Sequence, residues 1–273
     1  MNAPTRSQAP AEAILLREDQ GPVAVLTLNR AAARNSLSEA LIAALNETLA
    51  SIRSDRGIRA VVIAANGSAF CAGHDLKELT ARRADADGGR AYFQHIMTNC
   101  STMMQAIVTL PQPVIACVQG VATAAGCQLV ATCDLAVASS EARFATPGVD
   151  IGLFCSTPMV ALTRNIGRKK AMHMLMTGEP VTAEEARHIG LINTVVPPGR
   201  EREEAFALAS RIAAKSAHVL KIGKEAFYRQ AEMSLADAYR YAAAVMTENM
   251  MARDAQEGIC AFIDKRTPSW EDR

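Results

Sequence analysis

The stretch VIACVQGVATAAGCQLVATCDLAVAS, residues 114–139, decides the fold class of this chain. It begins with the apolar run Val114–Val118, breaks at Gly120, continues through small and apolar residues at 124–133, and ends in the second run Leu135–Ser139. Short apolar runs bounded by turn residues are typical of buried strands. Because parallel strands need a long and usually helical connection, the stretch predicts strand, helix and strand of an α/β protein.

The same alternation extends over the preceding part of the chain. Residues 23–29 (VAVLTLN) and 60–65 (AVVIAA) predict two more strands, with an amphipathic helix between them. Ser36 and Glu39 have the spacing of a capping box, which places the start of that helix at Ser36. We therefore expect a parallel sheet whose strands are connected by helices.

Three parts of the chain differ in composition. Residues 1–13 form a polar leader that we expect to be disordered, and residues 14–200 carry the alternating strands and helices. From Thr157 onward strand signals nearly vanish, and residues 201–273 are predicted to be a helical C-terminal region. Its recurrent apolar positions could close the same core or pack on another subunit.

Composition excludes several classes of function. The chain has 273 residues, 29 Lys and Arg against 28 Asp and Glu, and a formal net charge of +1. This balance offers no broad basic surface for nucleic acid or for an anionic membrane. The longest uncharged stretch, 91–133, is interrupted by Gln, Pro and Gly residues, so it predicts core elements and no membrane span.

Cysteine usage and the N-terminal sequence indicate the compartment. The seven cysteines include no C-x-x-C pair and no Cys/His ligand spacing, which favours reduced buried thiols and no metal site. The N-terminus lacks a basic segment followed by an apolar one, so we expect no secretion signal. These observations predict a cytoplasmic protein.

Two places in the sequence have the same shape, an apolar strand followed by a small-residue turn and a helix. They are AFCAGHDLKE at 69–78 and VQGVATAAGCQL at 118–129. A helix N-terminus leaves backbone N–H groups unpaired, and Gly and Ala let a ligand approach them closely. Two such turns side by side would form an oxyanion hole, although small residues at such a junction can equally serve tight packing.

The chain resembles the enoyl-CoA hydratase/isomerase (crotonase) family from about Ile14 to its end. The similarity covers residues 111–153, which include the second turn. It also covers VVIAANGSAFCAGHDLKEL at 61–79, MLMTGEPVTAEEARHIGLINTVVP at 174–197 and AFIDKRTPSW at 261–270. The resemblance implies a ββα spiral core and a helical C-terminal region that assembles homotrimers or hexamers. It also implies an acyl-CoA thioester substrate, with coenzyme A as part of the substrate and no other cofactor. By similarity, the His74 and Ala125 N–H groups would hold the thioester oxygen.

The sequence departs from the family pattern at the acid-base residues. Hydratases of the family use two glutamates, whose positions here are Gln128 and Gly148. Neither residue can take a proton from water near neutral pH. Asp150 is the nearest substitute and would project to the same side as Gly148 if the chain were extended, although it could equally be a solvated or capping residue. Cys155 precedes a helix start, which would lower the pKa of its thiol, unless it is an inert buried cysteine.

The positions expected to contact the coenzyme A phosphates are basic. Arg30, Arg34, Lys265 and Arg266 are candidates because of their places in family-like segments, and each could equally be a surface charge. The sequence therefore predicts an acyl-CoA enzyme that stabilises a thioester enolate. The alternative is an acyl-CoA-binding protein inactive as a hydratase, or a non-catalytic partner in an oligomer.

Overall fold

The computed structural model describes residues 13–273, so nearly all of the predicted leader lies outside the described residues. A six-stranded sheet forms the base of the core, in the order β1-β2-β3-β5-β7-β10. β1 pairs antiparallel with β2, and every other neighbouring pair in this sheet is parallel. The strands are β1 Leu15–Gln20, β2 Val23–Leu28, β3 Ala60–Ala65, β5 Val114–Val118, β7 Leu135–Ser139 and β10 Thr194–Val196.

A second sheet of four short strands has the order β4-β6-β8-β9. β4, β6 and β8 run parallel, and β9 closes the sheet antiparallel to β8. Each of three successive units places one strand in the large sheet and the next in the small sheet before a helical segment follows. This is the predicted ββα spiral. The short strands are β4 Ala69–Cys71, β6 Val121–Thr123, β8 Arg143–Ala145 and β9 Val181–Thr182.

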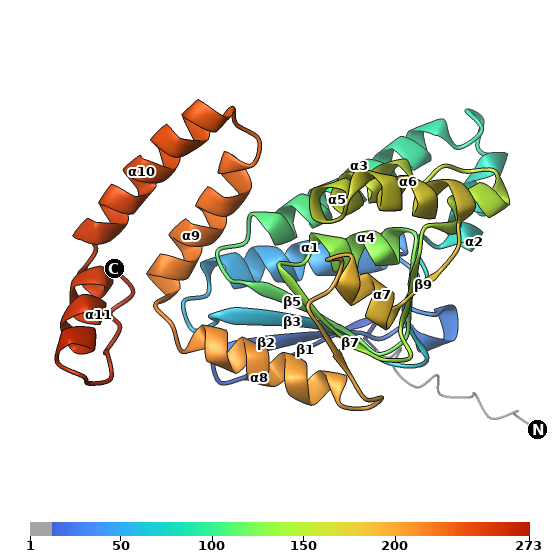
Figure 1. Cartoon of the computed structure of the whole chain (residues 1–273). Helices are drawn as coiled ribbons and strands as arrows, with labels where there is room; N and C mark the ends of the chain where they lie inside the picture. The colour runs from blue at the N-terminus through green and yellow to red at the C-terminus, as the bar shows by residue number, and fades with distance from the viewer. Residues whose placement is uncertain (1–12) are drawn as a thin grey trace, which may run out of the picture.

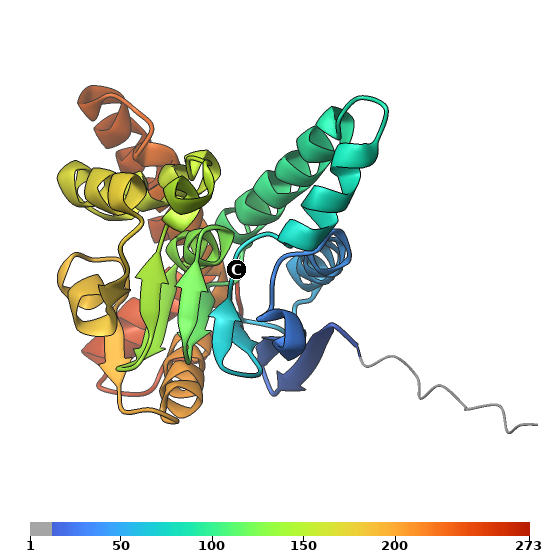
Figure 2. The ribbon, with the colours of Figure 1, turned by 90° about the vertical axis from the view of Figure 1, so that its right-hand side faces the viewer.

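Helices cover one face of the large sheet with the main hydrophobic core. Figures 1 and 2 show α1 and α4 directly above this face, with α3, α5 and α6 above or beside them. Leu41, Leu45 and Leu49 of α1 are fully buried there, as their helical spacing predicts. The predicted start of α1 at Ser36 is wrong by two residues, because Ser38 is the N-cap and accepts from the Leu41 N–H. These helices are α1 Glu39–Ser54, α3 Arg90–Val108, α4 Ala125–Thr132, α5 Ser156–Asn165 and α6 Arg168–Thr177.

One helix, α8 (Glu201–Ala213), covers the opposite face of the large sheet. Its Ala205, Ala209 and Ala213 pack on side chains of β2, β3, β5 and β7. Alanines at this spacing allow the helix to lie close to the sheet. The helical C-terminal region therefore begins with a helix that belongs to the core by packing. The short helix α7 Ala183–His188 contacts β8 and β9 of the small sheet, and the short helix α2 Leu76–Ala81 comes after β4 in the chain.

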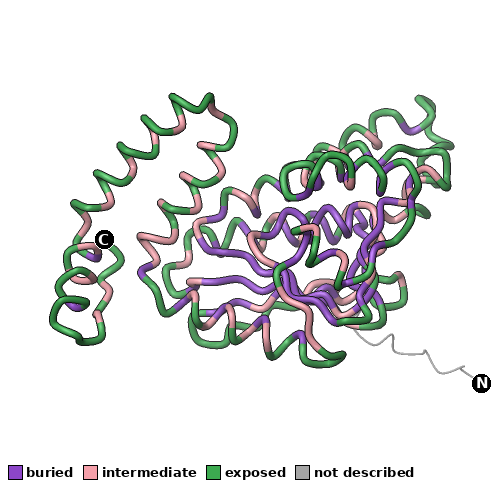
Figure 3. Tube along the Cα trace, in the orientation of Figure 1, coloured by how far each residue is buried: buried purple, intermediate pink, exposed green. Residues whose placement is uncertain are grey.

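The last three helices extend away from the core as a helical arm (Figure 1). They are α9 Ala217–Gln230, α10 Leu235–Met251 and α11 Arg253–Ile263. Figure 3 shows them mostly exposed, and apolar side chains such as Leu235, Met251 and Phe262 are 76%, 80% and 85% exposed. None of the helices within residues 13–273 is long and apolar enough to span a membrane.

A buried ion pair connects the arm to the core. Lys224 of α9 donates to the Asp134 carboxylate at 2.6 Å and to the carbonyls of Ile107 and Gln112. Tyr228 donates to the other oxygen of Asp134 at 2.9 Å. The Lys224 and Asp134 side chains are only 8% and 15% exposed, so solvent screens this pair weakly.

Candidate active site

Three neighbouring strands of the small sheet, β4, β6 and β8, end at the same edge because they are parallel. The segment 72–75 follows β4, Ala124 and Ala125 follow β6, and the segment 146–148 follows β8. The carboxyl ends of parallel strands are where open α/β folds bind ligands. The sequence segments predicted to form the site are therefore gathered at one place by the topology.

The first turn is held so that the His74 N–H points away from its supporting segment. Leu37 donates its N–H to the Gly73 carbonyl at 2.7 Å, and Asp75 donates its N–H to the Leu37 carbonyl at 3.1 Å. This is a parallel bridge between Leu37 and His74. Because successive amides of an extended chain point to opposite sides, the His74 N–H faces away from Leu37.

The second turn is strained at Ala124, whose φ of 50° and ψ of −118° lie in a region that a residue with a Cβ rarely adopts. Its N–H donates to the Ala145 carbonyl at 2.9 Å, which ties the end of β6 to the end of β8. Helix α4 begins with the next residue, Ala125, so the Ala125 N–H is one of the unpaired donors of a helix N-terminus. Such strain costs about 1–3 kcal/mol and is typical of functional sites.

The two turns are in direct contact. A Cβ placed on Gly73, whose φ is +92°, would lie 3.0 Å from the Ala124 Cβ and 3.5 Å from the Ala125 nitrogen. A Cβ on Gly126 would lie 2.1 Å from the Cys71 carbonyl oxygen. Neither the His74 N–H nor the Ala125 N–H donates to any group within residues 13–273. Two unpaired backbone donors thus lie on adjoining turns, as an oxyanion hole requires.

Buried polar side chains without partners surround these turns. Both ring nitrogens of His74, Oε1 of Gln128 and Oγ1 of Thr146 are buried and form no hydrogen bond within the described residues. Burial lowers the pKa of the His74 imidazole, which favours a neutral ring at pH 7. A contact of the ring with the Leu37 backbone, which falls short of the geometry of a hydrogen bond, opposes this shift only in part. A buried polar group without a partner is expensive, so these atoms indicate a place where water or a ligand binds.

Thr146 is a site residue that the sequence did not single out. It is fully buried and is the residue between β8 and the 3-10 turn Pro147–Ile151. Its position directly after a strand of the small sheet was the available signal, but that strand is only three residues long and the sequence did not predict it.

The two positions that replace the glutamates differ in their surroundings. Gln128 lies on α4, one turn after Ala124, and is 5% exposed. Gly148 has no free space beside it, because a Cβ there would lie 2.8 Å from the Leu153 carbonyl oxygen and 2.9 Å from the Cys155 Sγ. A glutamate side chain therefore does not fit at Gly148 without rearrangement.

The extended conformation assumed for Asp150 is wrong. Residues Pro147–Ile151 form a 3-10 turn, in which positions two apart do not share a side. The Asp150 carboxylate oxygens lie 3.1 and 3.2 Å from where a Cβ on Gly178 would be, at the C-terminal end of α6. The structure thus directs this carboxylate toward α6.

Cysteine chemistry is disfavoured at the site. Burial raises the pKa of the Cys155 thiol, although the Gly148 backbone counteracts this in part, so the lowered pKa expected at a helix start is wrong. Burial also raises the pKa of Cys71 to about 12. Six of the seven cysteines are buried, and Cys260 is exposed. Buried thiols with raised pKa values are poor nucleophiles.

The four candidate cations lie in different settings. Arg30 forms an ion pair with Asp75 at 3.0 Å, and Arg266 pairs with Glu257 at 2.6 Å, so a phosphate would have to share either guanidinium with a carboxylate. Arg34 is exposed beside the first turn, where its carbonyl accepts the Ala72 N–H at 3.1 Å. Lys265 is exposed and follows α11, which Figure 1 shows on the opposite side of the molecule from α2.

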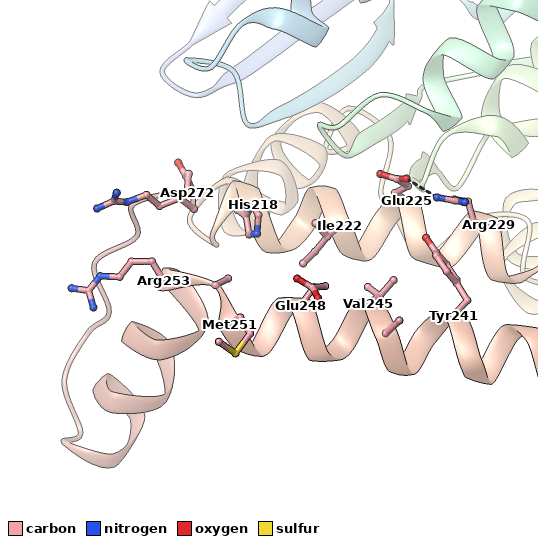
Figure 4. A pocket seen from close by; sticks show the side chains of 13 residues that line it. His218, Ile222, Glu225, Arg229, Tyr241, Val245, Glu248, Met251, Arg253 and Asp272 are labelled. Carbon is pink, nitrogen blue, oxygen red and sulfur yellow. Dashed lines mark hydrogen bonds and ion pairs between the residues drawn. The ribbon is translucent and has the colours of Figure 1, made fainter.

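A groove of about 930 Å³ lies elsewhere, between α9 and α10 of the helical arm. Figure 4 shows His218 and Ile222 of α9 facing Val245 and Glu248 of α10 across it. It contains no residue of the two turns and is distinct from the candidate active site. Within residues 13–273, no three His, Cys, Asp or Glu side chains are grouped to hold a metal ion.

Comparison with known proteins gives consistent matches over nearly the whole chain. A family model for enoyl-CoA hydratase/isomerase matches residues 18–273. Enoyl-CoA hydratase domain-containing protein 3 of Xenopus laevis is 46% identical over 256 residues, 94% of this chain and 85% of that protein. The crystal structure of an enoyl-CoA hydratase from Mycobacterium smegmatis is 51% identical, covers 95% of this chain and 99% of its own, and superposes with a TM-score of 0.90. The crystal structure of human enoyl-CoA hydratase domain-containing protein 3 is 43% identical, covers 94% of this chain and 100% of its own, and also superposes with a TM-score of 0.90.

These relatives contradict the predicted cytoplasmic location. The five relatives from Xenopus laevis, rat, human, mouse and zebrafish are all named mitochondrial. A missing secretion signal does not distinguish the cytoplasm from mitochondria, because the segments that direct proteins to mitochondria have a different, amphipathic composition. The fold and the extent of the matches agree: the chain belongs to the enoyl-CoA hydratase/isomerase family.

Proposed function

We propose that this protein is an acyl-CoA thioester enzyme that stabilises a thioester enolate with the backbone N–H groups of His74 and Ala125. The observation that carries the proposal is the contact between the two turns. The position of a Cβ on Gly73 is 3.5 Å from the Ala125 nitrogen, and both amides lack partners among residues 13–273. Family membership adds the expected substrate class, a coenzyme A ester.

The chemistry follows from where charge develops. Moving a proton or adding water next to a thioester turns its carbonyl oxygen into an enolate oxygen. Two fixed donors stabilise that oxygen more than they stabilise the neutral carbonyl, and one such donor is worth about 3–4 kcal/mol. The Ala125 N–H contributes further because it opens the eight-residue helix α4, whose N-terminus carries a partial positive charge.

Proton transfer must differ from the usual route with two glutamates. Gln128 can hydrogen-bond a water but cannot deprotonate it, and Gly148 offers no side chain. Oε1 of Gln128 and Oγ1 of Thr146 lack partners among the described residues, and each can hydrogen-bond a water. We favour such a water as the proton carrier over Asp150, because the Asp150 carboxylate lies against Gly178.

A second candidate function is acyl-CoA binding without hydration, including a role as a non-catalytic partner in a mixed oligomer. Gln128 and Gly148 favour it, since general acid-base catalysis contributes about 10²- to 10⁴-fold in rate. The crowding at Gly148 strengthens this alternative, because the second glutamate has no room there.

We further propose that the chain assembles as a homotrimer or a pair of trimers. The apolar side chains of the helical arm support this, since several are more than half exposed in one copy. We favour Arg34 for the coenzyme A phosphates within the same copy, because it forms no ion pair among residues 13–273. Lys265 would serve a phosphate only in a neighbouring copy, given its place beyond α11.

The test compares binding and turnover in one set of proteins. Calorimetry with butyryl-CoA measures binding, and loss of the conjugated thioester absorbance of crotonyl-CoA measures hydration. We expect the natural protein to bind butyryl-CoA. If the natural protein hydrates crotonyl-CoA, the result supports the enzyme. If the natural protein binds butyryl-CoA but does not hydrate crotonyl-CoA, and the Gln128→Glu variant does hydrate it, the result supports the inactive alternative. Absence of butyryl-CoA binding would refute both.

A further inference from the structure

We propose that the Arg30–Asp75 ion pair is a positioning device that sets the direction of the His74 N–H. The inference rests on the proposed function, since it gives a role to the first turn of the oxyanion hole. Neither residue touches the substrate in this proposal, so both are positioning residues.

Arg30 connects the support segment, residues 35–37, to the first turn, residues 72–75. Its Nη1 donates to the Ser36 carbonyl at 2.5 Å, and its Nη2 donates to Oδ2 of Asp75 at 3.0 Å. The Ser36 hydroxyl lies 3.3 Å from the same Asp75 oxygen. The Arg30 and Asp75 side chains are 20% and 12% exposed, so solvent competes little for these contacts.

Asp75 uses its other oxygen to hold the helix that follows. Oδ1 accepts the N–H groups of Lys77 at 3.1 Å and Glu78 at 3.5 Å, so Asp75 is the N-cap of α2. Burial alone would raise the pKa of Asp75, but the hydrogen bonds from Arg30, Glu78 and Lys77 together lower it. The residue directly after His74 is therefore an ionised carboxylate bonded on both sides.

The support segment is itself fixed to the core, so it can act as a template. Asn35 is fully buried, accepts the Arg30 N–H at 2.8 Å, and donates to the carbonyls of Asn66 and Ala69, each at 2.8 Å. Asn66 follows β3 and Ala69 begins β4. Arg30 is thus fixed relative to both sheets through Asn35, and its contact with Asp75 fixes Asp75 relative to them as well.

The backbone pattern makes His74 sensitive to this contact. Leu37 holds Gly73 on one side of His74 and Asp75 on the other. The His74 N–H shares a peptide plane with the Gly73 carbonyl, which the Leu37 N–H holds, and the Leu37 N–H shares a plane with the Ser36 carbonyl that accepts from Arg30. If Arg30 and Asp75 separate, the Ser36–Leu37 peptide and the His74 Cα shift and tilt the His74 N–H, while the Ala125 N–H stays in place on α4. A displacement of about 1 Å at such a donor can reduce its effect about 100-fold.

The experiment measures hydrogen bonding to a bound thioester without needing turnover. Butyryl-CoA labelled with ¹³C at the thioester carbonyl is bound to the full-length protein, and isotope-edited infrared difference spectra give its carbonyl stretch. In the natural protein we expect a shift to lower wavenumber. Asp75→Asn keeps an N-cap residue but loses the charge that pairs with Arg30. It should retain about half of the shift, the share of the Ala125 donor, with butyryl-CoA affinity by calorimetry within about threefold.

Two further variants keep the result decisive. Arg30→Met should match Asp75→Asn, and the double variant should lose no more than either single one, because both remove the same contact. Arg30→Lys keeps the charge without the guanidinium fork and should give an intermediate shift. Arg164→Met on α5 removes the exposed ion pair with Glu232, which follows α9, and serves as the matched control, with the full shift expected.

The outcomes separate the inference from the proposed function. If the natural protein binds butyryl-CoA without a carbonyl shift, the oxyanion hole itself is refuted. If the natural protein shows the shift and folded Asp75→Asn or Arg30→Met retains all of it, the positioning role is refuted and the proposed function stands. If those variants do not fold, Arg30→Lys decides by the same criterion.

Discussion

Gly126→Ala tests the contact between the two turns. Gly126 is the second residue of α4, and an added Cβ would lie 2.1 Å from the Cys71 carbonyl oxygen and 2.8 Å from the Cys71 carbonyl carbon. Ordinary contacts of a Cβ begin near 3.4 Å. Backbone atoms form both sides of this contact, so no flexible side chain can absorb the added volume. The start of α4, with the Ala125 N–H, must retreat from β4 by about 1 Å.

The expected loss follows from that displacement. A misplacement of about 1 Å costs about 100-fold in the stabilisation of a transition state, or about 2.7 kcal/mol. Because one pKa unit corresponds to about 1.4 kcal/mol, a bound thioester whose enolate is held by this site should have its pKa raised by about 2 units in the variant. Overpacking should also lower the free energy of unfolding by about 1–3 kcal/mol.

Acetoacetyl-CoA provides the readout, because its enolate absorbs in the ultraviolet and its ionisation needs no catalytic base. Titration of the bound ligand with pH gives its pKa in the natural protein and in Gly126→Ala. Gly223→Ala is the matched control, since Gly223 lies in helix α9 with no atom within 4 Å of its added Cβ. It should leave the pKa of the bound ligand unchanged. A folded Gly126→Ala protein in which bound acetoacetyl-CoA keeps the natural pKa would refute the reasoning.

Four further changes have outcomes that the structure determines. Gly148→Ala should lower the free energy of unfolding by about 1–3 kcal/mol in urea titrations, because the added Cβ meets a backbone carbonyl and a thiol. His74→Ala keeps the backbone donor; since burial lowers the pKa of His74, the natural protein should lose stability as pH falls below 6.5, and the variant should lose less. Lys224→Met leaves Asp134 without its buried cation and should lower the free energy of unfolding by about 3 kcal/mol in urea. Arg34→Ala should weaken butyryl-CoA binding about tenfold by calorimetry if this guanidinium contacts phosphate.

Each of these predictions has a control or an outcome that would contradict it. For Gly148 it is Gly167→Ala, whose added Cβ meets no atom within 4 Å and whose φ of −60° suits alanine, so it should leave the free energy of unfolding nearly unchanged. For His74, equal losses of stability between pH 7.5 and pH 5.5 in both proteins would contradict the assignment. For Lys224, the exposed Arg164→Met should leave the urea midpoint unchanged. For Arg34, a thioester that lacks the nucleotide should bind the natural protein and the variant equally.

The main elements of the core were predictable because their patterns are local. Val114–Val118 and Ala60–Ala65 are wholly apolar and lie in the middle of the large sheet, buried on both faces. The small sheet was not predictable in the same way. Strands of three residues, such as β8, are too short to show a periodicity, and their pairing partners are far apart in the sequence.

In the candidate site, too, features with a local sequence pattern were predictable and features that depend on the tertiary fold were not. The two turns were found from their glycines and alanines, because close approach of two backbones requires small residues at those positions. Asp150 was misplaced because the sequence does not distinguish an extended chain from a 3-10 turn after Pro147. The ion pair of Arg30 joins residues 45 positions apart, and a sequence shows only that an arginine is present. Contacts of this kind depend on the tertiary fold.

A crystal structure of the protein with bound butyryl-CoA tests the central claim most directly. The account predicts that the thioester oxygen lies about 2.7–3.1 Å from both the His74 and the Ala125 nitrogens. An ordered thioester whose oxygen contacts neither amide, with the amides bonded to water or to the protein's own carbonyls, would contradict it.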